Sequence, residues 1–294
     1  MSKIHPSAVI DKSAQIGSDV VIGPYCHVGP DVIVGDGCEL ISNVTLLGPS
    51  RFGTGNQVFP FSVLGAAPQD LKFKGGPTRL DVGDNNIFRE YVTAHRGTEV
   101  DHTSGGVTRI GNKNLFMIGA HIAHDSDVGN HVIIANAVQI AGHVRIEDCV
   151  NIGGVVGVHH FVTISRNSFV GGMSRITKDV PPYVKVIGYK QVIRGLNIEG
   201  IRRWNFSEDS ISKLRKATRL LFSRKEEQSV GRTKEALARI ENDGLMDDEH
   251  VCNLVGFLRR QLEVGVFGRI REHSRSDSDQ DREDFYESDG KEQS

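Results

Sequence analysis

The sequence predicts a mainly β protein, a parallel β-solenoid followed by a small α-helical domain, and two observations carry this prediction. The first is an apolar residue at every sixth position through most of residues 4–176. The second is the change to helical spacing of apolar residues from about residue 197. A period of six fits neither an α-helix, with about 3.6 residues per turn, nor a plain amphipathic strand, with about two. It fits short strands that are joined by corners and stacked as repeats.

The six-residue period holds in three blocks, which are separated by insertions at residues 66–81 and 99–109. The 26 apolar positions are Ile4, Ile10, Ile16, Ile22, Val28, Val34, Leu40, Leu46, Phe52, Val58 and Leu64, then Val82, Phe88 and Ala94, then Ile110, Phe116, Ile122, Val128, Ile134, Ile140, Ile146, Ile152, Val158, Ile164, Val170 and Ile176. Each buried Ile or Val contributes about 1.5–3 kcal/mol, so the stacked residues would form a continuous core.

Glycine often follows the apolar residue directly, as at Gly17, Gly23 and Gly35. Because glycine has no Cβ, we expect these residues to let the backbone bend between strands.

The end of the repeat marks the domain boundary. Two prolines in the segment 180–183 are expected to stop strand pairing. Helix-start residues follow at Ser207, and further helices are expected near 225–242 and 247–263. Residues rich in Asp, Glu and Ser at the end of the chain predict an acidic, disordered tail. The expected domains are a β-solenoid at 1–196, a helical domain at 197–268 and the tail at 269–294.

Composition excludes several classes of function. The 35 basic and 37 acidic residues nearly balance, so no footprint for nucleic acid or an anionic membrane is expected. No apolar run approaches the ~18 residues of a transmembrane helix. The repeat begins at Ile4, so we expect no signal peptide. Four scattered cysteines indicate a reducing compartment, and we expect a cytoplasmic protein.

Histidines cluster if three units close each coil. Ile122, Ile140 and Val158 are 18 residues apart and would stack in one column, and their units carry the histidines. Ala94 and Leu64 join this column if each insertion lies between whole coils, so both insertions would leave the same side of the solenoid. Histidine titrates near neutral pH and suits general base catalysis. A zinc site, as in β-helical carbonic anhydrases, is the other reading. The histidines of this column are His95, His124, His143 and His159.

Several segments, in the insertions, within the repeat and after it, carry a resemblance to a known family. They are Gln69–Arg79, Arg89-Glu90, His95–Thr98, Gly119–Asp125, Ala141–Val144, Ile152–Gly154, Val158-His159, Asp179–Tyr183 and Asn197–Gly200. Together they resemble the UDP-N-acetylglucosamine 3-O-acyltransferases, which perform the first step of lipid A synthesis in the cytoplasm of Gram-negative bacteria. The resemblance covers roughly residues 4–265. It implies a left-handed parallel β-helix with three hexapeptide units per coil.

The resemblance also implies an activity, the transfer of a fatty acyl chain, usually a 3-hydroxyacyl chain, from acyl carrier protein to the glucosamine 3-hydroxyl of UDP-N-acetylglucosamine. His124 matches the general base, Asp125 would orient it, and the N–H of Gly142 would stabilise the oxyanion. No metal and no cofactor are implied. The positions that match substrate contacts are Gln69, Asp70, Lys72, His95, His121, His143, His159, His160, Gly172, Asn197, Glu199 and Arg203.

The family's assembly is a homotrimer with its site between subunits, and acyl carrier protein docks on a basic surface of the helical domain. The residues that could supply this surface are Arg202, Arg203, Lys213, Arg215, Lys216 and Arg219. A solvated helix face is the alternative reading of these cations.

Some residues depart from the family's pattern. His160 stands where glutamine is frequent, Trp204 where a basic residue is frequent, and Lys190 where histidine is common near the acyl groove. Gly172 matches a position that limits acyl length, and a glycine favours a longer chain, although Phe169 and Met173 are bulky neighbours.

Two further functions stay open. The same base and scaffold would serve an N-acyltransferase that acts on a 3-amino sugar nucleotide. A non-catalytic β-solenoid is a more distant alternative, for which regular outward ladders of threonine or charge would be expected.

Overall fold

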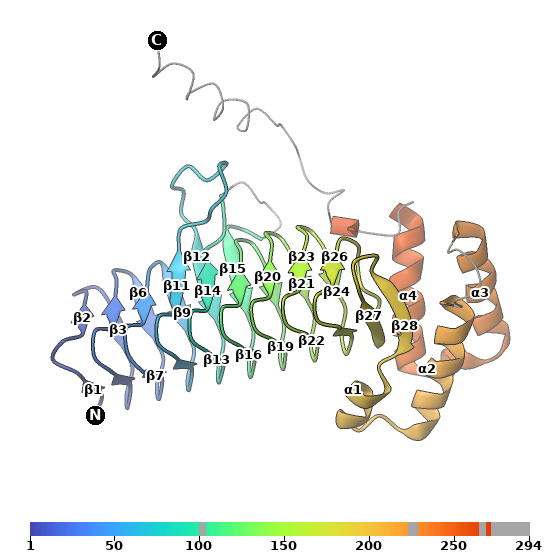
Figure 1. Ribbon diagram of the computed structural model, residues 1–294, viewed down its shortest axis with the longest axis horizontal. Coiled ribbons are helices and arrows are strands. Elements are labelled where there is room, and N and C mark those ends of the chain that lie inside the picture. The colour runs from blue at the N-terminus through green and yellow to red at the C-terminus, as the bar shows by residue number, and fades with distance from the viewer. Residues whose placement is uncertain (100–103, 223–228, 265–268, 272–294) are drawn as a thin grey trace, which may run out of the picture.

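The computed structural model describes residues 1–99, 104–222, 229–264 and 269–271. They form a long β-helix with three walls, and the α-helices gather at its C-terminal end (Figure 1). The predicted disordered tail lies outside the described residues except for its first three positions.

Each wall is a sheet of short strands that are parallel, except for one antiparallel strand at the end. The eleven-stranded sheet contains β1 (Lys3–Ile4), β4 (Val21–Ile22), β7 (Glu39–Leu40), β10 (Gln57–Val58), β13 (Ile87–Phe88), β16 (Leu115–Phe116), β19 (Ile133–Ile134), β22 (Asn151–Ile152), β25 (Phe169–Val170), β27 (Val184–Ile187) and β28 (Val192–Leu196). The nine-stranded sheet contains β2 (Val9–Ile10), β5 (His27–Val28), β8 (Thr45–Leu46), β11 (Val63–Ala66), β14 (Thr93–His95), β17 (His121–Ile122), β20 (Gln139–Ile140), β23 (Gly157–Val158) and β26 (Arg175–Ile176). The eight-stranded sheet contains β3 (Gln15–Ile16), β6 (Val32–Val34), β9 (Ser50–Phe52), β12 (Arg79–Val82), β15 (Val107–Ile110), β18 (Asp127–Val128), β21 (Arg145–Ile146) and β24 (Thr163–Ile164).

The strand register confirms the predicted column. Leu64 pairs with Ala94, Ala94 with Ile122, Ile122 with Ile140, and Ile140 with Val158. Both insertions leave the nine-stranded sheet and re-enter the eight-stranded one, so they do emerge at the same corner. Residues 67–78 and 96–106 separate these strands in the sequence.

The apolar residues at every sixth position form one continuous core. Those from Ile22 to Ile176 are almost fully buried, as the period predicts. Ile4 is 47% exposed, because the first coil has no coil below it to cover its side chain.

Glycines after the apolar residues serve a different purpose from the predicted one. A Cβ built at Gly23 would lie 1.7 Å from the carbonyl oxygen of Ile41 in the next coil. These glycines therefore allow adjacent coils to approach closely. The left-handed backbone at the corners is supplied largely by other residues, such as Asp125 with φ 57° and His143 with φ 61°.

The prolines do not end strand pairing, contrary to the prediction. β27 begins at Val184, pairs parallel with β25, and then forms an antiparallel pair with β28. Pro181 and Pro182 lie in the preceding turn, where no ladder N–H is needed.

The C-terminal helices pack around a second apolar cluster that includes Tyr183. Ser207 begins α2 as predicted, because its side chain accepts a hydrogen bond from the Ser210 N–H. The helices are α1 (Ile198–Arg203), α2 (Glu208–Leu221), α3 (Val230–Asn242), the 3₁₀ turn η1 (Leu245–Asp247) and α4 (Glu249–Val264).

Candidate functional site

His124 and Asp125 form a hydrogen-bonded pair at the corner that follows β17. The Nδ1 atom of His124 lies 2.9 Å from Oδ2 of Asp125. Because an ionised carboxylate only accepts, Nδ1 carries the proton, and in the neutral imidazole Nε2 then keeps its lone pair. The pair therefore has the arrangement of a general base and the group that orients it.

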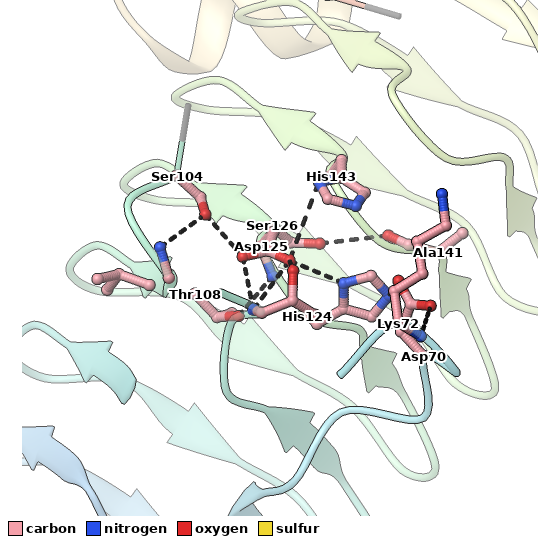
Figure 2. Close-up of polar contacts among 12 residues, drawn as sticks. Asp70, Lys72, Ser104, Thr108, His124, Asp125, Ser126, Ala141 and His143 are labelled. Carbon is pink, nitrogen blue, oxygen red and sulfur yellow. Dashed lines mark hydrogen bonds and ion pairs between the residues drawn. The ribbon is translucent and has the colours of Figure 1, made fainter. Parts of the chain in front are cut away.

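Several hydrogen-bond donors at the corner where the insertions emerge hold the Asp125 carboxylate in place. The residue is 1% exposed. The Ser104 hydroxyl donates to Oδ1 at 2.6 Å (Figure 2). The Thr98 hydroxyl donates to Oδ2 at 2.7 Å, and the Thr98 N–H donates to both oxygens. Burial raises the pKa of this carboxyl, but the hydrogen bonds from His124, Ser104 and Thr98 outweigh burial, so the pKa is lowered. Asp125 therefore stays ionised at neutral pH.

Figure 2 shows Asp70 beside the Nε2 edge of the His124 ring, whereas His143 lies next to both members of the pair, with its Nδ1 3.9 Å from Oδ2 of Asp125. Oδ2 of Asp70 is 3.7 Å from Nε2 of His124, and the Lys72 backbone N–H donates to Oδ1 of Asp70 at 3.0 Å. The His143 ring meets the His124 ring edge-on at 5.0 Å, and it stacks on Phe161. The first insertion and the next coil thus both contribute to the surroundings of the base.

The absence of a side chain at Gly142 leaves room for the His124 ring. A Cβ at Gly142 would lie 2.5 Å from Cε1 and 2.6 Å from Nε2 of His124. The imidazole therefore lies directly against the Gly142 backbone, and a side chain at this position would displace it.

A cavity of about 520 Å³ opens beside His124. The sequence missed Gln139 and Arg175 as lining residues, because both are outward residues of ordinary repeat units. The predicted site residues that line the cavity are Gln69, His95, His121, His124, His159 and His160.

Two of these histidines are held neutral. Burial and the neighbouring His95 and His124 lower the pKa of His121 to about 4, and the ring lies 2.7 Å from the Thr93 hydroxyl. Burial and His124 also lower the pKa of His95. Within the described residues Nδ1 of His95 is buried without a hydrogen-bond partner.

Asp70, His124 and His143 are also the described residues that could hold a metal ion. One ligand atom from each lies within 4.8 Å of the others. Imidazole and carboxylate groups are ordinary zinc ligands. The chemistry of the zinc alternative is therefore present at the same corner.

Asn197, Glu199 and Arg203 do not join this cluster within one chain. They line a separate cavity of about 350 Å³ on the eleven-stranded sheet, together with His131 and Trp204. The ring of Trp204 meets the ring of His131 at 5.0 Å. Gly172 is apart from both, at the exposed corner after β25.

The predicted basic surface is partly neutralised. Within it, Arg202 pairs with Glu208, Lys213 pairs with Asp209 and Asp247, and Lys216 pairs with Asp243. Lys190 lies elsewhere, in a cavity of about 210 Å³ between the last coil and the helices. None of the helices in the described part of the chain has the length and apolar character of a membrane-spanning segment.

Two family models match the chain. The bacterial transferase hexapeptide, with six repeats, matches residues 13–48, and the second domain of UDP-N-acetylglucosamine O-acyltransferases matches residues 179–266. Together with the fold, these matches fit the left-handed parallel β-helix that was predicted.

Curated relatives and solved structures agree with the models. The acyl-[acyl-carrier-protein]–UDP-N-acetylglucosamine O-acyltransferase of Paraburkholderia phymatum is 41% identical over 260 residues, which are 88% of this chain and 97% of that protein. The protein of that name from Saccharophagus degradans is 44% identical over 224 residues, 76% of this chain and 86% of its own length.

The structure of LpxA from Acinetobacter baumannii has a TM-score of 0.79 and 44% identity, and covers 86% of this chain and 95% of that one. The UDP-N-acetylglucosamine acyltransferase of Arabidopsis has a TM-score of 0.77 and 34% identity, and covers 90% and 99%. With a matching repeat, a matching second domain and relatives aligned over most of their length, the chain belongs to the family of acyl-[acyl-carrier-protein]–UDP-N-acetylglucosamine O-acyltransferases.

Proposed function

We propose that the protein transfers a 3-hydroxyacyl chain from acyl carrier protein to the 3-hydroxyl of UDP-N-acetylglucosamine, the first step of lipid A synthesis. The observation that carries this proposal is the His124–Asp125 pair beside a cavity of about 520 Å³, in a member of this enzyme family. A hydroxyl is a weak nucleophile, so its attack on a thioester needs a base of this kind.

The reaction follows from the protonation states at the site. Nε2 of His124 takes the proton of the sugar hydroxyl as its oxygen attacks the thioester carbon. The charge that develops on the thioester oxygen falls beside the Gly142 N–H. When the intermediate collapses, the C–S bond breaks, and the imidazolium returns its proton to the leaving thiolate. The ionised Asp125 stabilises the imidazolium while it exists.

Substrate positioning is assigned to the neutral histidines and the first insertion. His95 and His121 offer uncharged hydrogen-bonding nitrogens, which suit sugar hydroxyls. Asp70 lies close enough to His124 to accept from a neighbouring hydroxyl and to orient the acceptor. Gln69, Lys72, His143 and His160 complete this proposed set, and Gly172 is proposed to limit the acyl chain at its own corner.

His124→Ala tests the role of the base. We expect turnover to fall by about 10²–10⁴-fold, the usual contribution of a general base, with the melting temperature and assembly unchanged. The measurement is product formation from UDP-N-acetylglucosamine and 3-hydroxyacyl carrier protein. Activity above a tenth of the wild-type value would remove His124 from this role.

We propose the homotrimer that the family resemblance implies, and the two cavities on different walls of one chain fit a site shared between neighbouring subunits. In a ring of three, the wall with Asn197, Glu199 and Arg203 can face the histidine edge of the next subunit. Arg203 would then bind the nucleotide's diphosphate there. Mixing refolded His124→Ala and Arg203→Ala chains tests this arrangement. We expect mixed trimers to regain activity, because some interfaces would contain both intact residues; no recovery would contradict a shared site.

The N-acylation alternative is tested by product analysis. UDP-N-acetylglucosamine and its 3-amino analogue are supplied in parallel with carrier proteins that bear several chain lengths. A preference for the amine would replace the proposed acceptor.

The zinc alternative is tested by elemental analysis, and one zinc per chain would favour it. We also propose a cytoplasmic location, which the four free thiols support.

A further inference from the structure

The chain returns to the catalytic edge of the β-helix after α4. In Figure 1 the short red turn at residues 269–271 lies between the upper end of α4 and β26. Each residue of this turn makes a polar contact with a residue about 90 to 130 positions earlier in the chain. The contacts are Arg269 Nη1 with Nδ1 of His159 at 2.6 Å, the Ile270 N–H with Oδ2 of Asp179 at 3.0 Å, and Arg271 Nη1 with the His143 carbonyl oxygen at 2.8 Å.

The three partners of the turn lie along one corner of the prism. His143 follows β20, His159 follows β23 and Asp179 follows β26, which are successive strands of the nine-stranded sheet. His124 follows β17 at the same corner, one coil further toward the N-terminus. The turn therefore binds along the edge that carries the catalytic pair.

The contact between Arg269 and His159 determines which ring nitrogen carries the proton. A guanidinium has only donors and remains charged, so Nδ1 of His159 must accept. An imidazole that accepts at Nδ1 is neutral and carries its proton on Nε2. Arg269 is not a lining residue of the large cavity, whereas His159 is. The guanidinium thus acts on the ring from outside, and Nε2 is the nitrogen left to reach the cavity.

We propose that Arg269 is a positioning residue that fixes His159 as the neutral Nε2–H tautomer, so that His159 gives an uncharged hydrogen bond to an oxygen of the sugar nucleotide. The identity of the substrate in this proposal rests on the function proposed above, whereas the tautomer of His159 does not. It makes the C-terminal turn part of the acceptor site, although no repeat unit predicts it.

The chain offers a matched control for the proposal. Arg271 belongs to the same turn and also donates to the histidine edge, but its acceptor is a backbone carbonyl. Removing Arg271 weakens the attachment of the turn without changing any ring tautomer. A purely structural role of the turn would make the two arginines equivalent.

The kinetic test compares Arg269→Leu, Arg269→Lys and Arg271→Ala in the full-length enzyme. For Arg269→Leu we expect the KM for UDP-N-acetylglucosamine to rise about tenfold, the order of one lost hydrogen bond, with kcat within about threefold of wild type. Arg269→Lys keeps a donor and should restore most of the affinity. Arg271→Ala should leave KM within about twofold while lowering the melting temperature slightly.

The spectroscopic test reads the tautomer directly. In ¹⁵N-histidine-labelled enzyme, protonated and unprotonated ring nitrogens have well-separated shifts, and a His159→Gln sample identifies the His159 signals. We expect Nε2–H and bare Nδ1 in the wild type and in Arg271→Ala. In Arg269→Leu we expect averaging of the two tautomers.

Three results would overturn the proposal. They are a wild-type His159 protonated at Nδ1, an unchanged tautomer in Arg269→Leu, or equal KM effects of Arg269→Leu and Arg271→Ala. The two tests separate this proposal from the proposed function. Failure to acylate UDP-N-acetylglucosamine would sink the function while the ring signals still report on Arg269, and a wrong tautomer would sink this inference in an active enzyme.

Discussion

Asp125 is the residue on which the geometry of the catalytic pair depends. Its carboxylate receives the His124 ring on one oxygen and the Ser104 hydroxyl on the other, while Thr98 bridges both. These donors fix the plane of the carboxylate, and the carboxylate in turn fixes the plane of the imidazole. A hydroxyl that acts only through Asp125 can therefore change the reaction.

Ser104→Ala tests this dependence through pH. The Ser104 hydroxyl helps to lower the pKa of Asp125, so its loss raises that pKa and the carboxylate becomes protonated at a higher pH. The acid limb of the kcat–pH profile should therefore move to higher pH. Ser104→Thr keeps a hydroxyl and should retain the wild-type limb. Superimposable profiles for all three proteins would contradict the role of Ser104.

Gly142→Ala tests whether catalysis depends on the position of the His124 ring against the Gly142 backbone. The added Cβ would overlap the His124 ring, so the ring must rotate away from its partner carboxylate. We expect kcat to fall by about 10²-fold or more, since the base is misplaced. The melting temperature should change little because His124 lies outside the apolar core. Wild-type kcat in a folded variant would show that the ring can move without consequence.

At the scale of secondary-structure elements, the six-residue period predicted the strands because each strand has one inward residue that must be apolar. The period also placed His124 and His143 at one corner, since Ile122 and Ile140 pair in register. It could not place Asp70 or Ser104, which lie in loops where no inward position recurs. Arg269 was beyond reach, because a turn that returns from a distant helix leaves no periodic signal.

The glycines between strands give a test at this scale. Gly23→Ala would bring a Cβ to 1.7 Å from the Ile41 carbonyl oxygen, so the coils must separate locally. We expect a loss of about 1–3 kcal/mol in the free energy of unfolding, as for overpacked sites. Gly157→Ala is the control, because its Cβ would meet nothing within 4 Å. Chemical denaturation measures both, and equal effects would argue against close coil packing as the cause.

At the scale of the whole molecule, Asp179 joins the last coil to the C-terminal turn. Burial raises the pKa of this carboxyl to about 6, although the Thr163 and Ile270 N–H groups and nearby arginines oppose the shift. The native state therefore keeps a proton that the unfolded chain loses near its ordinary value of 3.8. Stability contributed by this proton is present at low pH and declines as pH rises toward and through about 6.

Asp179→Asn isolates this contribution, because asparagine does not titrate. The variant can be more or less stable overall, since its amide replaces one acceptor. Its melting temperature relative to wild type should nevertheless increase between about pH 4 and 6.5, the window set by the two pKa values. Thermal melts across this range measure the difference, and a constant offset would contradict the raised pKa.

Because each regular coil takes 18 residues, an insertion or deletion within the stacked strands keeps the walls aligned only if its length is a multiple of 18. Removing a whole coil shortens the stack and leaves every remaining side chain on its own wall. Removing one six-residue unit between Ile122 and Ile140 would still let each strand find a neighbour, yet it would turn His143 to a different wall from His124. Insertions and deletions here are thus limited more by the wall on which they place the later residues than by how much they lengthen or shorten the stack.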